Sequence, residues 1–245
     1  MHFTNTALLF SSISLSVALN PNCAPGGNFD LSHWTLQLPS GTPGHPTEIR
    51  AGQLGSDCHG YTNARYFFTD KADGALVMTV PGDKSNSDCV STPNSDHCRC
   101  ELRESQPSSW DPRADRNRLF GDLKVTKNTG EICVGQIHVD DSVSHKPVAE
   151  LYYNAAGDLK MGVQLCADNS CKQQRVDVDH VPRGQRFTYE IRYEKNVLEV
   201  SINGKALQKL DTHKLNAPKS YFKAGNYNQG SGPTEVHFYQ IKVSH

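Results

Sequence analysis

The chain has 245 residues and carries 25 Lys and Arg against 26 Asp and Glu, which gives a formal net charge of -1 at pH 7. This length fits a single large domain with a sizeable core. The neutral balance lacks the basic excess that nucleic-acid and membrane-surface binding usually require, although it leaves room for a locally basic groove. We therefore expect no nucleic-acid partner and no membrane partner.

The N-terminus carries an apolar run from Ala7 to Val17 that ends on small residues at Ser16, Val17 and Ala18. This pattern is typical of a secretory signal peptide, although the segment before the run has His2 but no Lys or Arg. We predict a signal over residues 1–18 and a single domain over residues 19–245. The mature protein is then expected to be secreted and extracellular, since no later stretch is apolar enough to span a bilayer.

Eight cysteines follow the predicted cleavage site. An even number in an exported chain indicates disulfides rather than catalytic thiols. Cys166 and Cys171 bracket a short polar segment and are expected to close a loop, whereas the pairing of the other six stays open. The chain has no paired C-x-x-C motif and the spacings are irregular, so a structural zinc site is not expected.

Alternation of apolar and polar residues recurs along the chain, and no long window has the period of a helix. Segments with this alternation are 34–38, 76–80, 159–165, 187–193 and 198–202. Many short strands separated by turn residues are typical of two packed antiparallel sheets. We predict an all-β fold, a β-sandwich or jelly roll.

Turn and loop signals fit this architecture. Lys195-Asn196 and Asn203-Gly204 are predicted hairpin turns, the second of them leading to a strand that starts at Ala206. A change of phase between Phe238 and Ile241 predicts a β-bulge in the last strand. The Pro- and Ser-rich segments 81–97 and 105–118 are predicted to be loops over a groove.

The first segment with candidate chemistry spans residues 98–104. On a strand, Arg99, Glu101 and Arg103 project from one face and Cys98, Cys100 and Leu102 from the other. A guanidinium bonds both oxygens of a carboxylate through its planar fork, so this face suits an acidic ligand. The alternative is a solvated ladder of opposite charges, which is common and contributes little.

Gln136-Ile137-His138 has the same division, with Gln136 and His138 on one face of a strand. Histidine titrates near neutral pH and can take a proton while the neighbouring amide donates to an acidic group. A histidine on a strand is nevertheless more often structural or solvated than catalytic, and the segment alone does not decide.

The third segment spans residues 221–229. Its alternation puts Tyr221, Lys223 and Tyr227 on one face and Phe222 and Ala224 on the other. A cation and a phenol on one face can hold an acidic ligand and exchange a proton with it. An amphipathic strand with a solvated polar face is the competing interpretation.

Together the three polar faces offer groups that bind a carboxylate and groups that move protons. This set suits removal of the proton alpha to a carboxylate, followed by β-elimination. The carboxylate must be neutralised while negative charge develops, a base must take the proton, and an acid must protonate the departing oxygen. No metal or other cofactor is needed in this scheme.

The segments 99–104, 136–138 and 221–229, in this order, resemble the three signature regions of the alginate lyases of polysaccharide lyase family 7. Residues 29–39 are similar to the opening strand of that family, so the resemblance covers nearly the whole mature chain. It implies a β-jelly roll whose concave sheet forms an open groove for an acidic polysaccharide. It also implies a secreted lyase that yields unsaturated oligouronates, and we expect it to be a monomer.

By position, the resemblance implies that Arg99 and Gln136 neutralise the carboxylate and that His138 assists or acts as the base. Tyr227 falls on the phenol that transfers the proton. In this family the residue after the first arginine is usually Ser or Thr, whereas here it is Cys100, with Cys98 also close. This sheet is therefore expected to be stapled by a disulfide.

Further positions are expected to contact or orient the substrate. Arg103 and Lys223 would line the subsites, and Glu101 would orient the arginines. Tyr221 and Gln229 would contact the sugars.

Three other functions compete with this interpretation. A lyase for another polyuronate, such as glucuronan, would use the same chemistry. A lectin-like sandwich would hold the same acidic glycan without needing His138 or Tyr227. A jelly-roll glycoside hydrolase needs two carboxylates beside the scissile bond, and no E-x-D-x-x-E motif is present. The preference for mannuronate or guluronate, endo or exo action and calcium dependence are left open.

Overall fold

The computed structural model describes residues 18–245 with gaps at 86, 94 and 169, so the predicted signal lies almost entirely outside the described residues. Two antiparallel sheets carry the fold, and the helices α1 (Pro25–Asn28) and α2 (Ala51–Leu54) are one turn each. The all-β prediction is confirmed. In the described part of the chain no helix has the length and apolar character needed to cross a membrane.

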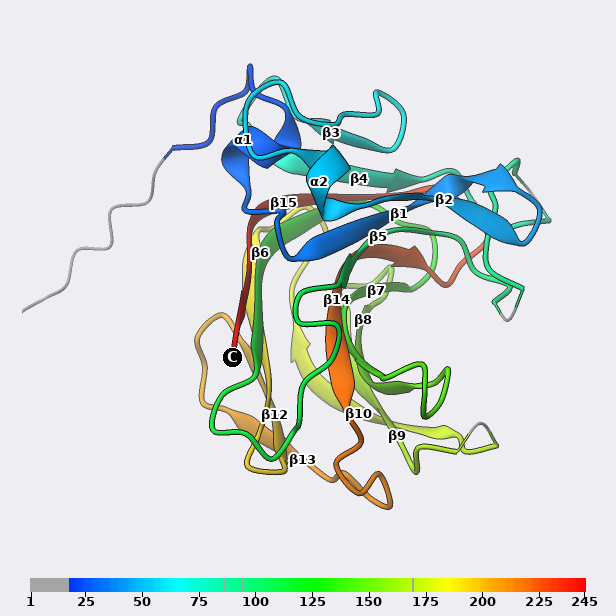
Figure 1. Cartoon of the computed structure of the whole chain (residues 1–245), viewed down its shortest axis with the longest axis vertical. Helices are drawn as coiled ribbons and strands as arrows, with labels where there is room; N and C mark the ends of the chain where they lie inside the picture. Colours follow the sequence, from blue (N-terminus) through cyan, green and yellow to red (C-terminus); the bar gives the residue numbers. More distant parts are fainter. Residues whose placement is uncertain (1–17, 86, 94, 169) are drawn as a thin grey trace, which may run out of the picture.

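One sheet has eight strands in the order β10-β9-β8-β7-β14-β5-β1-β2. The edge formed by β9 and β10 lies in the lower half of Figure 1. Their bounds are β1 Trp34–Thr42, β2 His45–Ile49, β5 Arg99–Glu104, β7 Ile132–Val139, β8 Pro147–Tyr153, β9 Asp158–Gln164, β10 Gln173–His180 and β14 Ser220–Asn228.

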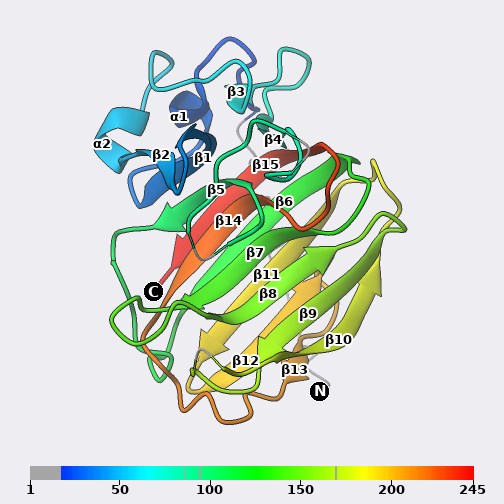
Figure 2. The same ribbon diagram turned by 90° about the vertical axis from the view of Figure 1, so that its right-hand side faces the viewer.

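The other sheet has seven strands in the order β13-β12-β11-β6-β15-β4-β3, and it lies behind the first in Figure 2. Their bounds are β3 Phe67–Thr69, β4 Leu76–Val80, β6 Arg118–Lys127, β11 Phe187–Glu194, β12 Val197–Ile202, β13 Gln208–Leu210 and β15 Thr234–Ser244.

The core lies between the two sheets because each strand turns its apolar residues inward. In β11, buried and half-buried residues alternate without a break, so its outer face is polar. Tyr189 of β11 reaches across the core and donates a hydrogen bond from its hydroxyl to the carbonyl of Val134 in β7, 3.0 Å away. A Cβ at Gly135 would lie 2.7 Å from that hydroxyl, so only glycine lets the ring come this close.

Most of the predicted strands and turns are present, with small shifts. Lys195, Asn196 and Asn203 have positive φ, as tight hairpin turns require. The strand after Asn203-Gly204 begins at Gln208 rather than at Ala206. The predicted bulge in the last strand is confirmed by a register shift between Phe238 and Gln240. Leu165 departs from the predicted alternation, because it lies past the end of β9 and is exposed.

The cysteine prediction is confirmed in part. Disulfides join Cys23 to Cys58, Cys89 to Cys98, and Cys166 to Cys171. Cys100 and Cys133 are buried free thiols, so the expectation that all eight cysteines pair is wrong. Cys100 turns into the core and donates from its Sγ to the carbonyl of Tyr66. Only Cys98 staples β5, and its partner lies in the preceding loop.

The three segments singled out in the sequence become three neighbouring strands. β14 lies between β5 and β7, and Figure 2 shows the three side by side in the front sheet. Lys223 is paired in register with Arg103 of β5 and with Gln136 of β7. Gly225 allows β5 to approach closely, since a Cβ there would lie 2.6 Å from the carbonyl oxygen of Cys100. Segments far apart in sequence therefore meet on one face.

Candidate active site

A cavity of about 440 Å³ lies over β5, β14 and β7. Both predicted loops contribute to its wall, with Thr92 and Ser95 from the first and Ser105 and Ser108 from the second. Among the predicted residues, eight line this cavity: Arg99, Glu101, Arg103, Gln136, His138, Tyr221, Lys223 and Tyr227. Gln229 does not line it; this residue lies past the end of β14, where its amide donates to the carbonyl of Tyr227.

The polar side chains at the floor of the cavity are buried. The exposed fraction is 9% for Arg99, 1% for Glu101, 1% for Gln136 and 7% for Lys223. A solvated ladder of charges would leave these groups in water, so that alternative is excluded. Buried charges are retained where they are paired and hydrogen-bonded, which makes the pairing of these four groups informative.

Glu101 is the common partner of this cluster. Its Oε2 is 2.9 Å from Nζ of Lys223 and 3.3 Å from Nη1 of Arg99. Its Oε1 accepts a hydrogen bond of 2.6 Å from Nε2 of Gln136. Burial works to raise the pKa of Glu101, but Lys223 and Arg99 outweigh it and hold that pKa below its usual value. Two cations face one carboxylate, so the cluster has an excess positive charge.

The donors of this cluster are not all used by Glu101. The Gln136 amide has two N–H donors, of which one is held by Glu101. The buried Nε of Arg99 has no hydrogen-bond partner among the described residues. An anion entering the cavity therefore meets positive charge and N–H groups that are already oriented.

Tyr227 lies at one end of the cluster, opposite Arg99 in register. Its hydroxyl is 2.9 Å from Oγ of Ser95. Burial raises the pKa of Tyr227, while the Arg99 guanidinium and the hydrogen bond with Ser95 work to lower it. The phenol is thus protonated at rest, beside a cation that favours its ionised form.

His138 lies at the other end, stacked on the ring of Tyr221 with 5.0 Å between ring centres. Its Nδ1 is 2.8 Å from the carbonyl oxygen of Val139, which assigns the proton to Nδ1 and the lone pair to Nε2. Burial, and then the charge of Lys223, lowers the pKa of His138 to about 3. The ring is therefore uncharged at neutral pH and can accept a proton.

Arg103 is not held by Glu101, contrary to the expectation that this carboxylate orients both arginines. Nη2 of Arg103 is 2.7 Å from Oδ2 of Asp141, whose Oδ1 accepts a 3.1 Å bond from the hydroxyl of Tyr221. The guanidinium carbon of Arg103 also lies 4.3 Å from the centre of the Tyr221 ring. Asp141 thus positions both groups from the loop after β7.

Sequence reasoning missed several polar residues of the cavity wall, among them Ser95, Asp141 and Glu150. Ser95 and Asp141 lie in irregular loops, where no periodicity shows which way a side chain points. Glu150 is buried in β8 opposite Gln136 and accepts a 2.6 Å bond from the hydroxyl of Tyr152. Burial raises the pKa of Glu150. The two-residue spacing of Glu150 and Tyr152, which puts both on one face of the strand, was the signal that could have placed Glu150 in the site.

The described residues contain no group of three or more His, Cys, Asp and Glu side chains placed to hold a metal ion. What the cavity offers is a fixed set of cationic and amide donors, an uncharged imidazole and a phenol. Such a set can bind a carboxylate and move protons next to it.

Comparison with known proteins gives consistent matches. A family model described as alginate lyase matches residues 29–245. An alginate lyase of Klebsiella pneumoniae is 23% identical, and the alignment covers 91% of this chain and 91% of that one. A variant of the family 7 alginate lyase A1-II′, solved in complex with a product, is 32% identical with a TM-score of 0.76, over 91% of this chain and 99% of that one. An alginate lyase of Pseudomonas aeruginosa is 30% identical with a TM-score of 0.72, over 88% and 99%.

Proposed function

The chain belongs to the alginate lyase family, and we propose that it cleaves alginate by β-elimination in the cavity over β5, β14 and β7. The observation that carries this proposal is the cluster in which Glu101 bonds Arg99, Gln136 and Lys223 between His138 and Tyr227. It combines a neutralising site for a carboxylate with a proton acceptor and a proton donor.

Arg99 and Gln136 would receive the carboxylate of the uronate that is cleaved. Neutralising this group makes the alpha proton more acidic, because the negative charge that forms when it leaves spreads onto the carboxylate. Glu101 holds both donors in place, so little reorganisation is needed when the substrate binds. Lys223 and Arg103 would line the adjoining subsites, and Tyr221 would contact a sugar ring.

Tyr227 would donate its proton to the departing glycosidic oxygen. The base would depend on the sugar epimer. For an alpha proton on the same side as the leaving oxygen, the phenolate form of Tyr227 would take it and pass it on to that oxygen. For one on the opposite side, Nε2 of His138 would take it and the phenol of Tyr227 would supply the proton for the oxygen. The electron pair of the broken C–H bond forms the double bond of the unsaturated product, and the glycosidic C–O bond breaks with its electrons going to oxygen.

The experiment that tests this function uses the purified chain with polymannuronate, polyguluronate and glucuronan in separate reactions. Absorbance of the unsaturated product is followed together with product size. Absorbance rising on an alginate substrate supports the proposal, and a rise on glucuronan alone assigns a related lyase. Binding with no rise and no loss of viscosity would overturn catalysis in favour of a glycan-binding sandwich.

We propose in addition that the protein acts outside the cell. Its three disulfides support this location, since such bonds persist in oxidising compartments. Cells expressing the full chain should release a protein whose N-terminus follows Ala18. Retention of the full-length chain inside the cells would contradict the predicted signal over residues 1–18.

A further inference from the structure

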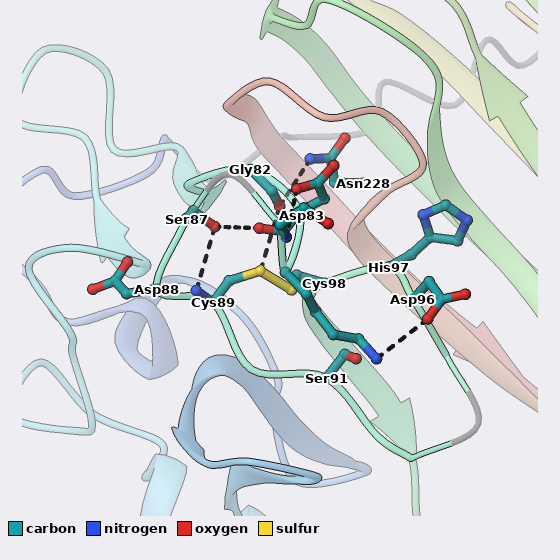
Figure 3. Close-up of a disulfide and its surroundings, with 12 residues drawn as sticks. Gly82, Asp83, Ser87, Asp88, Cys89, Ser91, Asp96, His97, Cys98 and Asn228 are labelled. Atoms are coloured by element: carbon teal, nitrogen blue, oxygen red, sulfur yellow. Dashed lines mark hydrogen bonds and ion pairs between the residues drawn. A yellow bond between two sulfur atoms is a disulfide. The ribbon is translucent and has the colours of Figure 1, made fainter.

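The loop between β4 and β5 is fixed at both ends beside Tyr227. The Cys89–Cys98 disulfide closes its second half, directly before β5 (Figure 3). Near its start, the carbonyl of Gly82 accepts a 3.2 Å bond from the side-chain amide of Asn228, the residue after Tyr227. Within the closed part, Oγ of Ser91 donates to the carbonyl of Ser95. These contacts hold the described residues of the loop over the end of β14.

The Ser95 hydroxyl has three partner groups, two on His97 in this loop and one on Tyr227 of β14. It is 2.9 Å from the hydroxyl of Tyr227, it donates to the carbonyl of His97 at 3.1 Å, and it accepts from the N–H of His97 at 3.1 Å. A hydroxyl has one proton and two lone pairs. When Ser95 donates to the His97 carbonyl, its second lone pair must accept the proton of Tyr227. Rotation of the same hydroxyl would instead direct its proton at the Tyr227 oxygen.

We propose that Ser95 is a positioning residue for Tyr227. The Ser95 hydroxyl accepts a hydrogen bond from the phenol at rest and donates one to the phenolate that forms during the reaction. This inference rests on the proposed lyase function. Because Ser95 belongs to the disulfide-closed loop and not to the sheet, its contact with Tyr227 depends on that loop.

The contact matters because every form of the elimination passes through ionised Tyr227. When the alpha C–H bond breaks, the base takes the proton and the electron pair forms the carbon–carbon double bond. The bond to the glycosidic oxygen then breaks with its electrons going to oxygen. That oxygen takes the proton of Tyr227 and leaves a phenolate. A hydrogen bond to a charged acceptor is stronger than one between neutral groups, so Ser95 stabilises the phenolate more than the phenol.

The test compares Ser95→Ala with Ser95→Thr and with Ser87→Ala. Ser87 is a matched control, since its hydroxyl bonds the carbonyl of Asp83 and the N–H of Cys89 in the same loop (Figure 3). For each variant, kcat and KM on alginate are measured across pH. The tyrosinate absorbance of each protein is titrated and compared with that of its Tyr227→Phe counterpart, which isolates Tyr227.

The expected result for Ser95→Ala is a fall in kcat of about ten- to a hundredfold with KM unchanged, and a higher pKa for Tyr227. Ser95→Thr, which keeps the hydroxyl, restores both values, and Ser87→Ala matches the wild type. The charged and titratable groups facing Tyr227 stay the same in all variants: His97, Arg99, Glu101, Cys133 and Glu150.

Two results would overturn the inference: an unchanged Tyr227 titration in Ser95→Ala, or an equal loss of kcat in Ser87→Ala, which would show a general effect of the loop. A wild-type protein that forms no unsaturated product would instead overturn the proposed function. The tyrosinate titration still decides the role of Ser95 in that case, because it needs no substrate.

Discussion

Arg99 lies against the face of the Tyr227 ring, with its guanidinium carbon 3.7 Å from the ring centre. The two residues are opposite each other on β5 and β14, and the same guanidinium bonds Glu101. The group proposed to neutralise the carboxylate therefore also stabilises the proposed proton carrier. A positive charge over the ring favours the phenolate and offsets part of the effect of burial on the pKa of Tyr227.

Replacing Tyr227 with Phe should remove the chemistry and leave the fold intact. The ring that packs on Arg99 remains, and only the hydroxyl is lost. We expect kcat to fall by about 10²–10⁴-fold, the range for one general acid or base, as measured by absorbance of the unsaturated product. Tyr221→Phe is the matched control, because its hydroxyl bonds Asp141 and is given no proton-transfer role. An equal fall in kcat for both variants would contradict the assignment to Tyr227.

His138 should remain uncharged across the neutral range. Its pKa of about 3 results from burial and from the charge of Lys223. In NMR titrations, the ring signal assigned by its loss in His138→Gln should not shift between about pH 5 and 8. Lys223→Gln removes the nearby charge and should raise the pKa of His138. A signal that titrates near pH 6.5 in the wild type would contradict the lowered pKa of His138 and its attribution to burial and Lys223.

Glu101→Gln should destabilise the protein in a pH-dependent way. The variant leaves Arg99 and Lys223 buried without their counter-charge, which typically costs about 3–5 kcal/mol in the free energy of unfolding. The folded-state pKa of Glu101 is lowered, so its stabilisation is present above the unfolded-state value of about 4.3 and is lost as pH falls through the folded-state value.

Urea unfolding of wild type and Glu101→Gln at several pH values measures this difference. The gap between the two proteins should be full at neutral pH and shrink in acid below about pH 4. A gap that does not change with pH would show that the amide loses packing or hydrogen bonds rather than charge pairing.

The sequence allowed the strands and the faces of the site to be predicted because both follow from alternation. Arg99, Glu101 and Arg103 share one face for the same reason that Cys98 and Leu102 are buried on the other. The adjacency of β5, β14 and β7 is a matter of topology, and the resemblance rather than the periodicity indicated it. Partners were harder to predict than faces, as the pairing of Arg103 with Asp141 illustrates.

Loop residues and cysteine pairing could not be predicted for a different reason. The position of Ser95 depends on a disulfide, on the carbonyl that Ser91 holds and on the path of an irregular loop. None of these has a period in the sequence. The even number of cysteines was misleading for Cys100 and Cys133, which are buried and unpaired. A free cysteine packs in a strand like a small apolar residue and needs no disulfide partner.

The two short disulfide loops should contribute similarly to stability and differently to catalysis. Cys89–Cys98 and Cys166–Cys171 have sequence separations of 9 and 5, so loop closure predicts a loss of about 2–3 kcal/mol for removing either pair by alanine substitution. Only the first loop carries Ser95 to Tyr227. Removing Cys89–Cys98 should therefore lower kcat in conditions where the protein is still folded, whereas removing Cys166–Cys171 should leave kcat unchanged. Urea unfolding and initial rates on alginate measure the two effects separately, and equal kcat values in both double variants would show that the loop holds its position without the disulfide.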